Sequence, residues 1–399
     1  MVGQVVTGRE ARSELADRIR ERARELGFDL IGFGSANPFD EEKTLILEHL
    51  AQGHLRGMSW ITPERVALSC NPDELLPGAR SIVGLGTSYA SSRAPSASSQ
   101  LIGRVARYAW GKDYHDVIPP KLRLLAEFIQ ELGGPDIATR TFVDTGPLVD
   151  RAAARRTGVG FVGKNTCLLT GRQGSYVFLS AILCTLDLPA DPLVTKDCGS
   201  CRACIDACPT EALIAPGAMD ATRCISYLTI EHRGSIPRER RPWIGDWVFG
   251  CDICQEVCPW NRARSATEHA EFAAAEGVGP ELDLAQLLTL DEAGFRSRFR
   301  GTPLTRARRA GLLRNAAVVL GNRGDAAAEG VLLAALDDLD PLVREHAAWA
   351  LGRIGDLSEG AESQILAVWA RETDGTVREE LGILVAASGR IPSEPVVPG

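Results

Sequence analysis

The sequence predicts an α+β protein with more than one domain. Strand and helix patterns alternate through about residue 187, and eight of the eleven cysteines fall between Cys198 and Cys258. Helices dominate after about residue 283. A chain of 399 residues has room for two or three domains with sizeable cores. We therefore expect an N-terminal α/β domain over 1–187, a cysteine-rich module over 188–265 and a helical domain over 283–399.

The N-terminal domain is expected to open with an amphipathic helix over 10–28, where Leu15, Ile19 and Ala23 recur at helical spacing. Apolar runs bounded by turn residues then predict buried strands. The strands are expected at 30–39, 81–90, 139–147 (running into a loop) and 176–188, and further helices at 121–133 and 150–158. This alternation is typical of helices layered on a sheet.

The C-terminal domain shows an internal repeat. The segments RNAAVVLG (314–321) and HAAWALG (346–352) align at an offset of 31, and each is followed by Gly-Asp. Ala-rich helices with a period in the low thirties are typical of a HEAT-like α-solenoid. Two or three such repeats cannot bury their faces alone, so we expect them to dock on the rest of the protein.

Composition excludes several classes of protein. The net charge of −8 argues against a protein that is basic over its whole surface. The longest uncharged run, 173–186, is too short to span a bilayer, and the N-terminal segment is charged and lacks the apolar core of a signal peptide. We expect a cytoplasmic protein with no membrane partner.

The cysteine spacing indicates two iron–sulfur clusters. The run C-x2-C-x2-C-x3-C-P over 198–209 matches two-cluster ferredoxins, in which the fourth cysteine of the run ligates the other cluster. A second half follows, with Cys224 and then C-x2-C-x3-C-P over 251–259. Pairing the halves gives two sets of four ligands: Cys198, Cys201, Cys204 and Cys258 for one [4Fe–4S] cluster, and Cys208, Cys224, Cys251 and Cys254 for the other.

The alternative is a pair of zinc sites with four thiolates each, because soft thiolates also suit zinc. The spacing favours clusters, and two clusters in one small module can pass electrons one at a time to an acceptor nearby. Cys70, Cys167 and Cys184 lie outside the pattern, and we interpret them as buried and inert.

Several motifs together resemble the epoxyqueuosine reductase family. They are CGSCRACIDACPTEAL (198–213), RCISYLTIEHRG (223–234), GCDICQEVCPWN (250–261), RYAWGKDYHD (107–116) and VDTGPLVDRAAARRTGVGFVGKNTCL (143–168). The resemblance covers nearly the whole chain. It implies that the N-terminal domain binds cobalamin beside a ferredoxin-like module, and that the enzyme removes the epoxide oxygen of epoxyqueuosine at the tRNA wobble position to form queuosine.

The resemblance also implies roles for single residues. On its own, Asp144 before Thr-Gly is more typical of a turn or helix-cap residue, but in Val-Asp-Thr-Gly-Pro it matches the family's proposed general acid. Asp113-Tyr114-His115 begins like a cobalamin-binding Asp-x-His-x-x-Gly motif, but residue 118 is Ile. We therefore interpret His115 as structural or pocket-lining and not as a cobalt ligand.

Nine residues in the matching motifs are candidates for contacts with cobalamin, each with an ordinary surface or core role as the alternative. They are Arg65, Lys164, Asn165, Thr166, Leu168, Arg223, Ser226, Asp252 and Ile253.

Local arginine crowding indicates where RNA would bind. The segment 296–323 contains eight Arg and no Asp or Glu, and arginine suits phosphate recognition. A solvated helix face is the alternative. The tRNA-binding candidates are Arg238, Arg240, Arg241, Arg306, Arg308, Arg309 and Arg314.

Taken together, the sequence predicts a monomeric, cytoplasmic reductase that receives electrons from an external low-potential donor and acts on the anticodon stem-loop of tRNA. Two other functions are considered. A reductive dehalogenase-like corrinoid enzyme would lack the arginine-rich repeats and would usually carry an export signal. A non-enzymatic electron-carrier subunit would show no corrin absorption.

Overall fold

The computed structural model describes residues 9–91, 101–262, 264–355 and 357–387, and it confirms the α+β fold class. The chain forms two compact units, each assembled from separate stretches of sequence. The described part of the first unit contains 9–91, Gly111–Cys224 and Asp252–Gly277. That of the second contains 101–110, Ile225–Cys251 and 278–387. The three domains expected from the sequence stay a prediction.

A four-stranded antiparallel sheet forms the centre of the first unit. Its strand order is β1 (Leu30–Ser35), β2 (Ser81–Ser88), β7 (Val177–Cys184) and β4 (Thr139–Val143). The two central strands pair over their full length, from Ser81 opposite Cys184 to Ser88 opposite Val177. Every residue of β2 is buried, because both faces of the sheet are covered.

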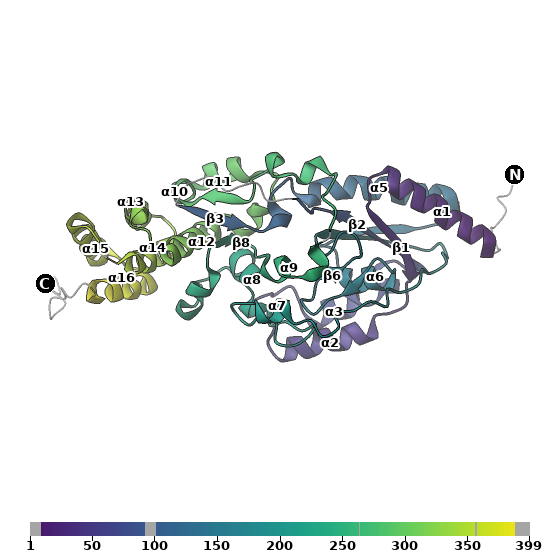
Figure 1. Ribbon diagram of the computed structural model, residues 1–399, viewed down its shortest axis with the longest axis horizontal. Coiled ribbons are helices and arrows are strands. Elements are labelled where there is room, and N and C mark those ends of the chain that lie inside the picture. The colour runs from purple at the N-terminus through teal and green to yellow at the C-terminus, as the bar shows by residue number, and fades with distance from the viewer. Residues whose placement is uncertain (1–8, 92–100, 263, 356, 388–399) are drawn as a thin grey trace. The chain divides into compact units, whose positions relative to one another are not determined.

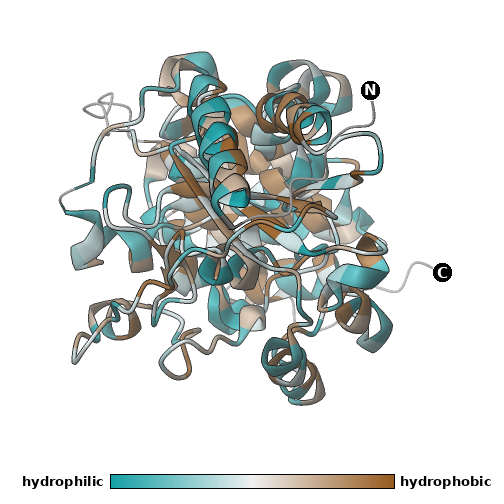
Figure 2. Cartoon of the chain, turned by 90° about the vertical axis from the view of Figure 1, so that its right-hand side faces the viewer, coloured by the Kyte–Doolittle hydropathy of each residue, from teal (hydrophilic) through white to brown (hydrophobic). Residues whose placement is uncertain are grey.

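Helices cover both faces of this sheet (Figure 1). On one face α1 (Arg9–Glu25) lies beside α5 (Tyr114–Gly133). On the other, α2 (Asp40–Ala51), α3 (Pro63–Ser69), α4 (Pro72–Leu75) and α6 (Asp150–Arg156) share an apolar core with the strands. Figure 2 shows the apolar residues, in brown, gathered about the strands and on the inner sides of the helices.

Two glycines let α6 pack closely against the sheet. A Cβ added at Gly84 in β2 would lie 2.0 Å from Oγ1 of Thr157, which follows α6, and one added at Gly32 in β1 would lie 2.0 Å from the Thr157 carbonyl oxygen. A larger residue at either position would push the helix away from the strands.

One helix is longer than predicted. The sequence places a helix over 121–133, but α5 begins at Tyr114 and continues through Pro119 and Pro120. The two prolines argued against an earlier start. The side chain of Asp113, which accepts a hydrogen bond from the His115 amide at 3.0 Å, caps the helix and starts it before them.

The remaining elements of the first unit are short. They are β5 (Phe161–Val162), β6 (Leu168–Leu169), α7 (Ala203–Asp206), the 3₁₀ helices η2 (Ala221–Arg223), η4 (Pro259–Asn261), η5 (Ala270–Phe272) and η6 (Ala274–Glu276), and α9 (Ile253–Glu256). Two of them contain a cysteine: Cys204 lies in α7 and Cys254 in α9.

The second unit combines a small sheet with helices. Strand β3 (Ile102–Val105) pairs in parallel with β8 (Trp247–Phe249) and antiparallel with β9 (Glu281–Asp283). The helices are η1 (Arg107–Ala109), α8 (Ile225–Ile230), η3 (Arg238–Ile244), α10 (Leu284–Leu288), α11 (Glu292–Phe299), η7 (Pro303–Ala307), α12 (Arg308–Arg323), η8 (Ala326–Ala328), α13 (Glu329–Ala335), α14 (Pro341–Ile354), α15 (Glu359–Arg371) and α16 (Gly375–Ala387).

The predicted repeats lie on α12 and α14, which pack against each other where a Cβ on Gly321 would come within 2.7 Å of Trp349. Every residue of α12 from Gly311 to Gly321 is buried. As expected, the first repeat helix docks on other parts of the protein, since α12 contacts α8 and β8. Among the described residues, no helix is both long and apolar enough to cross a membrane.

We predict that Gly84→Ala destabilises the first unit by about 1–3 kcal/mol, because the added methyl group must displace Thr157. Urea unfolding of the wild-type and variant proteins measures this difference. Gly171→Ala is the matched control, since a Cβ there meets no described atom within 4 Å. An equal midpoint for both variants would contradict the packing argument.

Candidate active site

The thiols of the first predicted cluster are neighbours in the first unit. Burial raises the pKa of the Cys204 thiol, and Cys258 and Cys198 raise it further. Burial likewise raises the pKa of Cys258, on which Cys198 and Cys201 also act. The Lys164 amide donates a hydrogen bond to Cys198 Sγ at 3.5 Å. Cys258, distant in sequence, therefore lies near Cys198, Cys201 and Cys204, and the assignment of the four thiols to one cluster stays a prediction.

The structure shows the cysteines without disulfide bonds: none of the eleven is paired with another. Within the described residues, no group of three or more His, Cys, Asp or Glu side chains is placed to hold a single metal ion.

The second predicted set draws on both units. Cys208 Sγ accepts a hydrogen bond from the Ala212 amide at 3.3 Å, and Cys224 follows η2 in the first unit. Cys254 lies in α9. Cys251 follows Gly250 after β8 and belongs to the second unit. The assignment of these four thiols to one cluster stays a prediction.

One cysteine outside the pattern contacts a predicted ligand. The thiol of Cys167 hydrogen-bonds Cys254, which lowers the pKa of Cys167, and its charge also acts on Cys258. Cys70 and Cys184, by contrast, are buried in the first unit, at 2% and 0% exposure. Spacing alone gave no sign of this role for Cys167, because residue 167 precedes the ferredoxin-like run.

Asp144 directly follows β4 and is held in an unusual backbone conformation. Its φ of 45° lies in the left-handed region, which non-glycine residues adopt mainly where the surrounding structure requires it. Tyr114 Oη donates a hydrogen bond to Asp144 Oδ2 at 2.6 Å, and the Tyr114 ring stacks on Phe178 at 4.3 Å. Asp144 does not cap α6, which begins at Asp150. The carboxyl group is fixed, yet its side chain is 62% exposed.

His115 lies between two carboxylates. Its Nδ1 is 2.8 Å from Asp113 Oδ1, and its Nε2 is 3.6 Å from Asp144 Oδ2. Burial alone would lower the pKa of His115, but the two carboxylates outweigh it and raise the pKa to about 9. The imidazole is therefore protonated at neutral pH. Its position fits the interpretation of His115 as pocket-lining, which stays a prediction.

Helix α6 connects this carboxyl group to the cysteine loops. Burial raises the pKa of Asp150 to about 8, and the nearby Asp144 carboxyl contributes to the shift. Arg151 Nη1 donates a hydrogen bond to the Thr166 carbonyl at 2.8 Å. Asn165 Nδ2 in turn donates to the Cys254 carbonyl at 3.4 Å. Hydrogen bonds and adjacent residues in the first unit thus lead from Asp150, which lies near Asp144, to a predicted cluster ligand.

Of the nine cobalamin candidates, all except Ser226 lie in the first unit. Asn165, Leu168 and Asp252 are almost fully buried. Two charged candidates are occupied by the protein: Lys164 Nζ donates to the carbonyls of Gly199 at 2.6 Å and Cys201 at 3.0 Å, and Arg223 pairs with Glu211 at 3.0 Å. Arg65, Thr166 and Ile253 are half-buried. Contacts between these residues and cobalamin stay predictions.

The surroundings of Asp144 fit a bound cofactor. His115 Nε2 is buried and has no hydrogen-bond partner among the described residues, while the carboxyl beside it is exposed. Buried polar atoms normally have partners. A group that covers Asp144 would complete this site, so the residues present are compatible with cobalamin here.

Comparison with known proteins identifies the family. The model of epoxyqueuosine reductase (QueG, DUF1730) matches residues 70–145, that of a 4Fe-4S double cluster binding domain matches 197–261, and that of HEAT repeats matches 304–384. The epoxyqueuosine reductase of Xanthomonas campestris pv. campestris is 42% identical over 88% of this chain and 99% of its own. The chain belongs to the epoxyqueuosine reductase family.

Other members of the epoxyqueuosine reductase family are similar to this chain over nearly its whole length. The Bacillus subtilis epoxyqueuosine reductase is 37% identical over 94% of this chain and 97% of its own. A crystal structure of epoxyqueuosine reductase with an epoxyqueuosine-modified tRNA-Tyr stem loop superposes with a TM-score of 0.88 at 35% identity, covering 94% of this chain and 99% of the other. The match to the double-cluster model shows that this member of the family binds two [4Fe–4S] clusters.

In this epoxyqueuosine reductase family member, two of the seven tRNA-binding predictions are wrong. Arg314 is fully buried and donates to the carbonyls of Leu228, His232 and Gly234; burial lowers its pKa to about 9. Arg241 is 2% exposed and pairs with Glu345 and Glu380. Both guanidinium groups serve the protein interior, so neither can reach a phosphate.

The other five lie at or near the surface of the second unit. Arg309 is 15% exposed and is held by Asp338 and the Leu290 carbonyl. Arg240 is half-buried. Arg238 pairs with Glu380. Arg306 and Arg308 are exposed. Both act electrostatically on Arg233, also exposed, so the three form one group of net positive charge, in which Glu231 pairs with Arg306 at 2.9 Å and with Arg233 at 3.7 Å. The sequence analysis missed Arg233 because it stands beside Glu231, outside the acid-free run.

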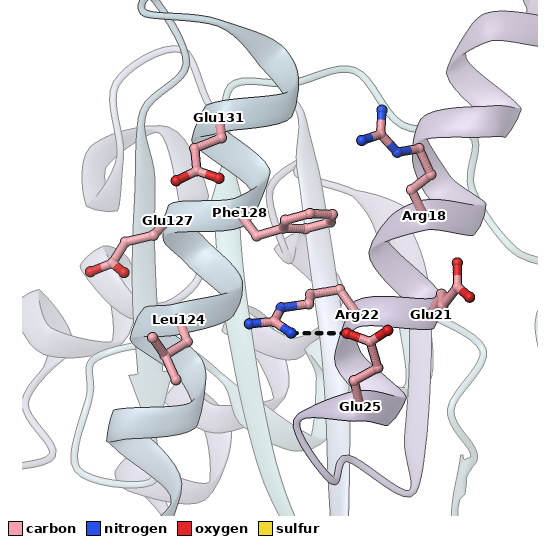
Figure 3. A pocket seen from close by; sticks show the side chains of 8 residues that line it. All are labelled: Arg18, Glu21, Arg22, Glu25, Leu124, Glu127, Phe128 and Glu131. Atoms are coloured by element: carbon pink, nitrogen blue, oxygen red, sulfur yellow. Dashed lines mark hydrogen bonds and ion pairs between the residues drawn. The ribbon is translucent and has the colours of Figure 1, made fainter.

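A separate cavity of about 370 Å³ lies between α1 and α5 (Figure 3). Its lining combines four glutamates with two arginines, Leu124 and Phe128, and the figure shows Arg22 paired with Glu25 at 2.9 Å. None of the predicted site residues lines it.

We predict a pH-dependent contribution of His115 to stability. Because its folded pKa of about 9 exceeds its ordinary 6.5, the ionised ring stabilises the fold fully below pH 6.5, and this stabilisation is lost as the pH rises through about 9. The wild-type protein should therefore exceed His115→Gln in urea midpoint by more below pH 6.5 than above pH 9. Asp113→Asn should lower the His115 titration midpoint measured by NMR. A pH-independent difference would show that the ring is neutral throughout.

Proposed function

We propose that this protein reduces epoxyqueuosine to queuosine at the wobble position of tRNA. One observation carries the proposal: the similarity to epoxyqueuosine reductases spans the Asp144 loop, the cysteine module and the helical repeats in a single chain. A reductive dehalogenase-like enzyme or an electron-carrier subunit would not require this combination. Conversion of the epoxide to the alkene takes two electrons and two protons and releases the oxygen as water.

Electrons would come from an external low-potential donor through the two [4Fe–4S] clusters. Cobalamin, when bound, supplies a reducing cobalt centre at the epoxide. Among this chain's own residues, Arg65, Thr166 and Ile253 are accessible enough to hold it, while Asn165 and Lys164 support the cysteine loops. A cytoplasmic, monomeric protein is part of this proposal.

Protons would reach the departing oxygen through Asp144. Tyr114 fixes the carboxyl group, and the protonated His115 holds a proton 3.6 Å from Asp144 Oδ2. Asp113 holds the His115 ring in place beside Asp144. Positioned proton transfer of this kind contributes roughly 10²–10⁴-fold to rate.

The tRNA would be held in part by the exposed basic group of Arg233, Arg306 and Arg308. Arginine forms bidentate bonds with phosphate, and such contacts release counterions. The wobble base must be turned out of the loop to reach a buried cofactor. The crystal structure of a related reductase with a tRNA stem loop supports an RNA substrate.

We predict that Asp144→Asn keeps cobalamin and tRNA binding but lowers turnover by at least about 100-fold, because the amide cannot donate an acidic proton. Tyr114→Phe should cause a smaller loss, since it removes the bond that orients Asp144 and keeps the ring stacked on Phe178. Single-turnover assays on modified tRNA measure both. Asp136→Asn, an exposed carboxyl elsewhere in the unit, is the control. Near wild-type turnover in Asp144→Asn would assign Asp144 to a turn.

We predict that Arg306→Gln with Arg308→Gln weakens tRNA binding about tenfold and makes its salt dependence shallower by about 0.7–0.9 per lost phosphate contact. Turnover at saturating tRNA should change little. Arg371→Gln, an exposed and ion-paired arginine on α15, is the control. If affinity and salt slope stay at wild-type values, the RNA lies on another face, and Arg238 and Arg240 become the next candidates.

A further inference from the structure

Within the second unit, the hydroxyl of Thr229 joins two backbone segments that each lead to a cysteine. It donates to the Ile225 carbonyl at 2.8 Å, and it accepts a hydrogen bond from the Gly250 amide at 2.9 Å. Ile225 directly follows Cys224, and Gly250 directly precedes Cys251. Thr229 itself is fully buried.

Asn315 on α12 makes a second connection between the same segments. Its Nδ2 donates to the Thr229 carbonyl at 2.7 Å and to the Val248 carbonyl at 2.9 Å. One buried side-chain amide thus spans α8 and β8 from a helix distant in the sequence. An unpaired carbonyl in this interior would be costly, so both bonds are needed.

Arg314 orients Asn315 and closes the end of α8. Its Nε and Nη2 donate to Asn315 Oδ1 at 3.1 and 2.8 Å, so the amide nitrogen must face the two carbonyls. Its remaining bonds go to the carbonyls of Leu228, His232 and Gly234, at 2.6–2.8 Å. These carbonyls otherwise lack partners at a helix C-terminus.

The strand end before Cys251 is held at three consecutive residues. The Val248 carbonyl binds Asn315, the Phe249 carbonyl accepts from the Ala106 amide at 2.8 Å, and the Gly250 amide binds Thr229. Gly250 has φ 68°, and a Cβ there would lie 2.5 Å from Ala106 Cβ. The backbone next to Cys251 therefore has one conformation available.

We propose that Thr229 and Asn315 are positioning residues for the second [4Fe–4S] cluster. Within the second unit they hold the backbone of Ile225 and Gly250, the residues next to Cys224 and Cys251, two of its four predicted thiolate ligands. A cluster demands fixed distances between its sulfurs, and hydrogen bonds around ligands hold such sites closed and tune them. The inference rests on the assignment of Cys208, Cys224, Cys251 and Cys254 in the proposed function.

Four variants of the full chain, purified anaerobically with clusters in place, test it, and a fifth, Cys208→Ser, identifies the EPR signal of the second cluster. Thr229→Val removes the hydroxyl with little change in shape, and Thr229→Ser restores it. Asn315→Ala removes the bridging amide. Its matched control is Asn322→Ala on the same helix: Asn322 also donates to two carbonyls, of Arg241 at 2.9 Å and Gly245 at 3.0 Å, but neither lies next to a cysteine.

The readouts are iron and acid-labile sulfide per chain, the rate of iron release to a chelator, and the EPR spectrum of the reduced protein. Wild-type protein should contain about eight iron and eight sulfide. In Thr229→Val and Asn315→Ala, about half of the iron should leave roughly tenfold faster, and one of two EPR signals should change. The signal that changes should be the one lost in Cys208→Ser. Thr229→Ser and Asn322→Ala should behave as wild type.

Several outcomes overturn the proposal. If iron is released from Thr229→Val and Asn315→Ala at the wild-type rate, the positioning role is refuted, but the assignment of two clusters still stands. An equal acceleration for all the iron, or an effect of Asn322→Ala as large as that of Asn315→Ala, would also refute the positioning role, since either marks general destabilisation. Wild-type protein without labile sulfide would instead refute the cluster assignment itself, and with it the proposed function.

Discussion

A single buried helix supplies the polar groups on which the second unit depends. Eleven consecutive residues of α12 are buried, and two of them, Arg314 and Asn315, are polar. Their cost of burial is offset because each donor meets a backbone carbonyl that would otherwise be unpaired. The apolar neighbours pack α12 against α14, while these two side chains fasten α8 and β8 to it. Packing and hydrogen bonding thus both depend on the same helix.

Two carboxyl groups near Asp144 in the first unit have pKa values shifted in opposite directions. Burial raises the pKa of Asp150 to about 8, so this carboxyl is largely neutral at physiological pH. Asp113 is also half-buried, but its hydrogen bonds with His115 outweigh burial and lower its pKa. Asp150 therefore keeps its proton, whereas Asp113 and His115 form an ion pair. Asp144 is near both groups, which is compatible with its proposed role in proton transfer.

Sequence reasoning succeeded where local spacing determines structure. The cysteine run places Cys198, Cys201 and Cys204 on one short segment, so these three thiols could be grouped before any fold was known, whereas Cys258 was added by pairing the two halves of the motif. It failed for Arg241 and Arg314, because guanidinium groups are ambiguous: the same side chain suits a phosphate or a set of buried carbonyls, and only the tertiary structure decides. The partners of Asp144 were hidden for a related reason. Tyr114 and His115 reach it from a helix whose start, before Pro119 and Pro120, depends on the Asp113 cap.

The contacts of α12 also bear on how this protein can be divided. Residues 304–384 match a repeat family that in general stacks as interchangeable modules. Here the first helix of that region is committed to the segment between Cys224 and Cys251. A chain truncated before α12 would leave the carbonyls of Leu228, Thr229 and Val248 without their hydrogen-bond donors. It would also lack Arg314, which binds the C-terminal end of α8. The repeats therefore cannot be removed or exchanged as a cassette: an excision that preserves the iron–sulfur segment must retain α12, and the earliest permissible cut falls after it.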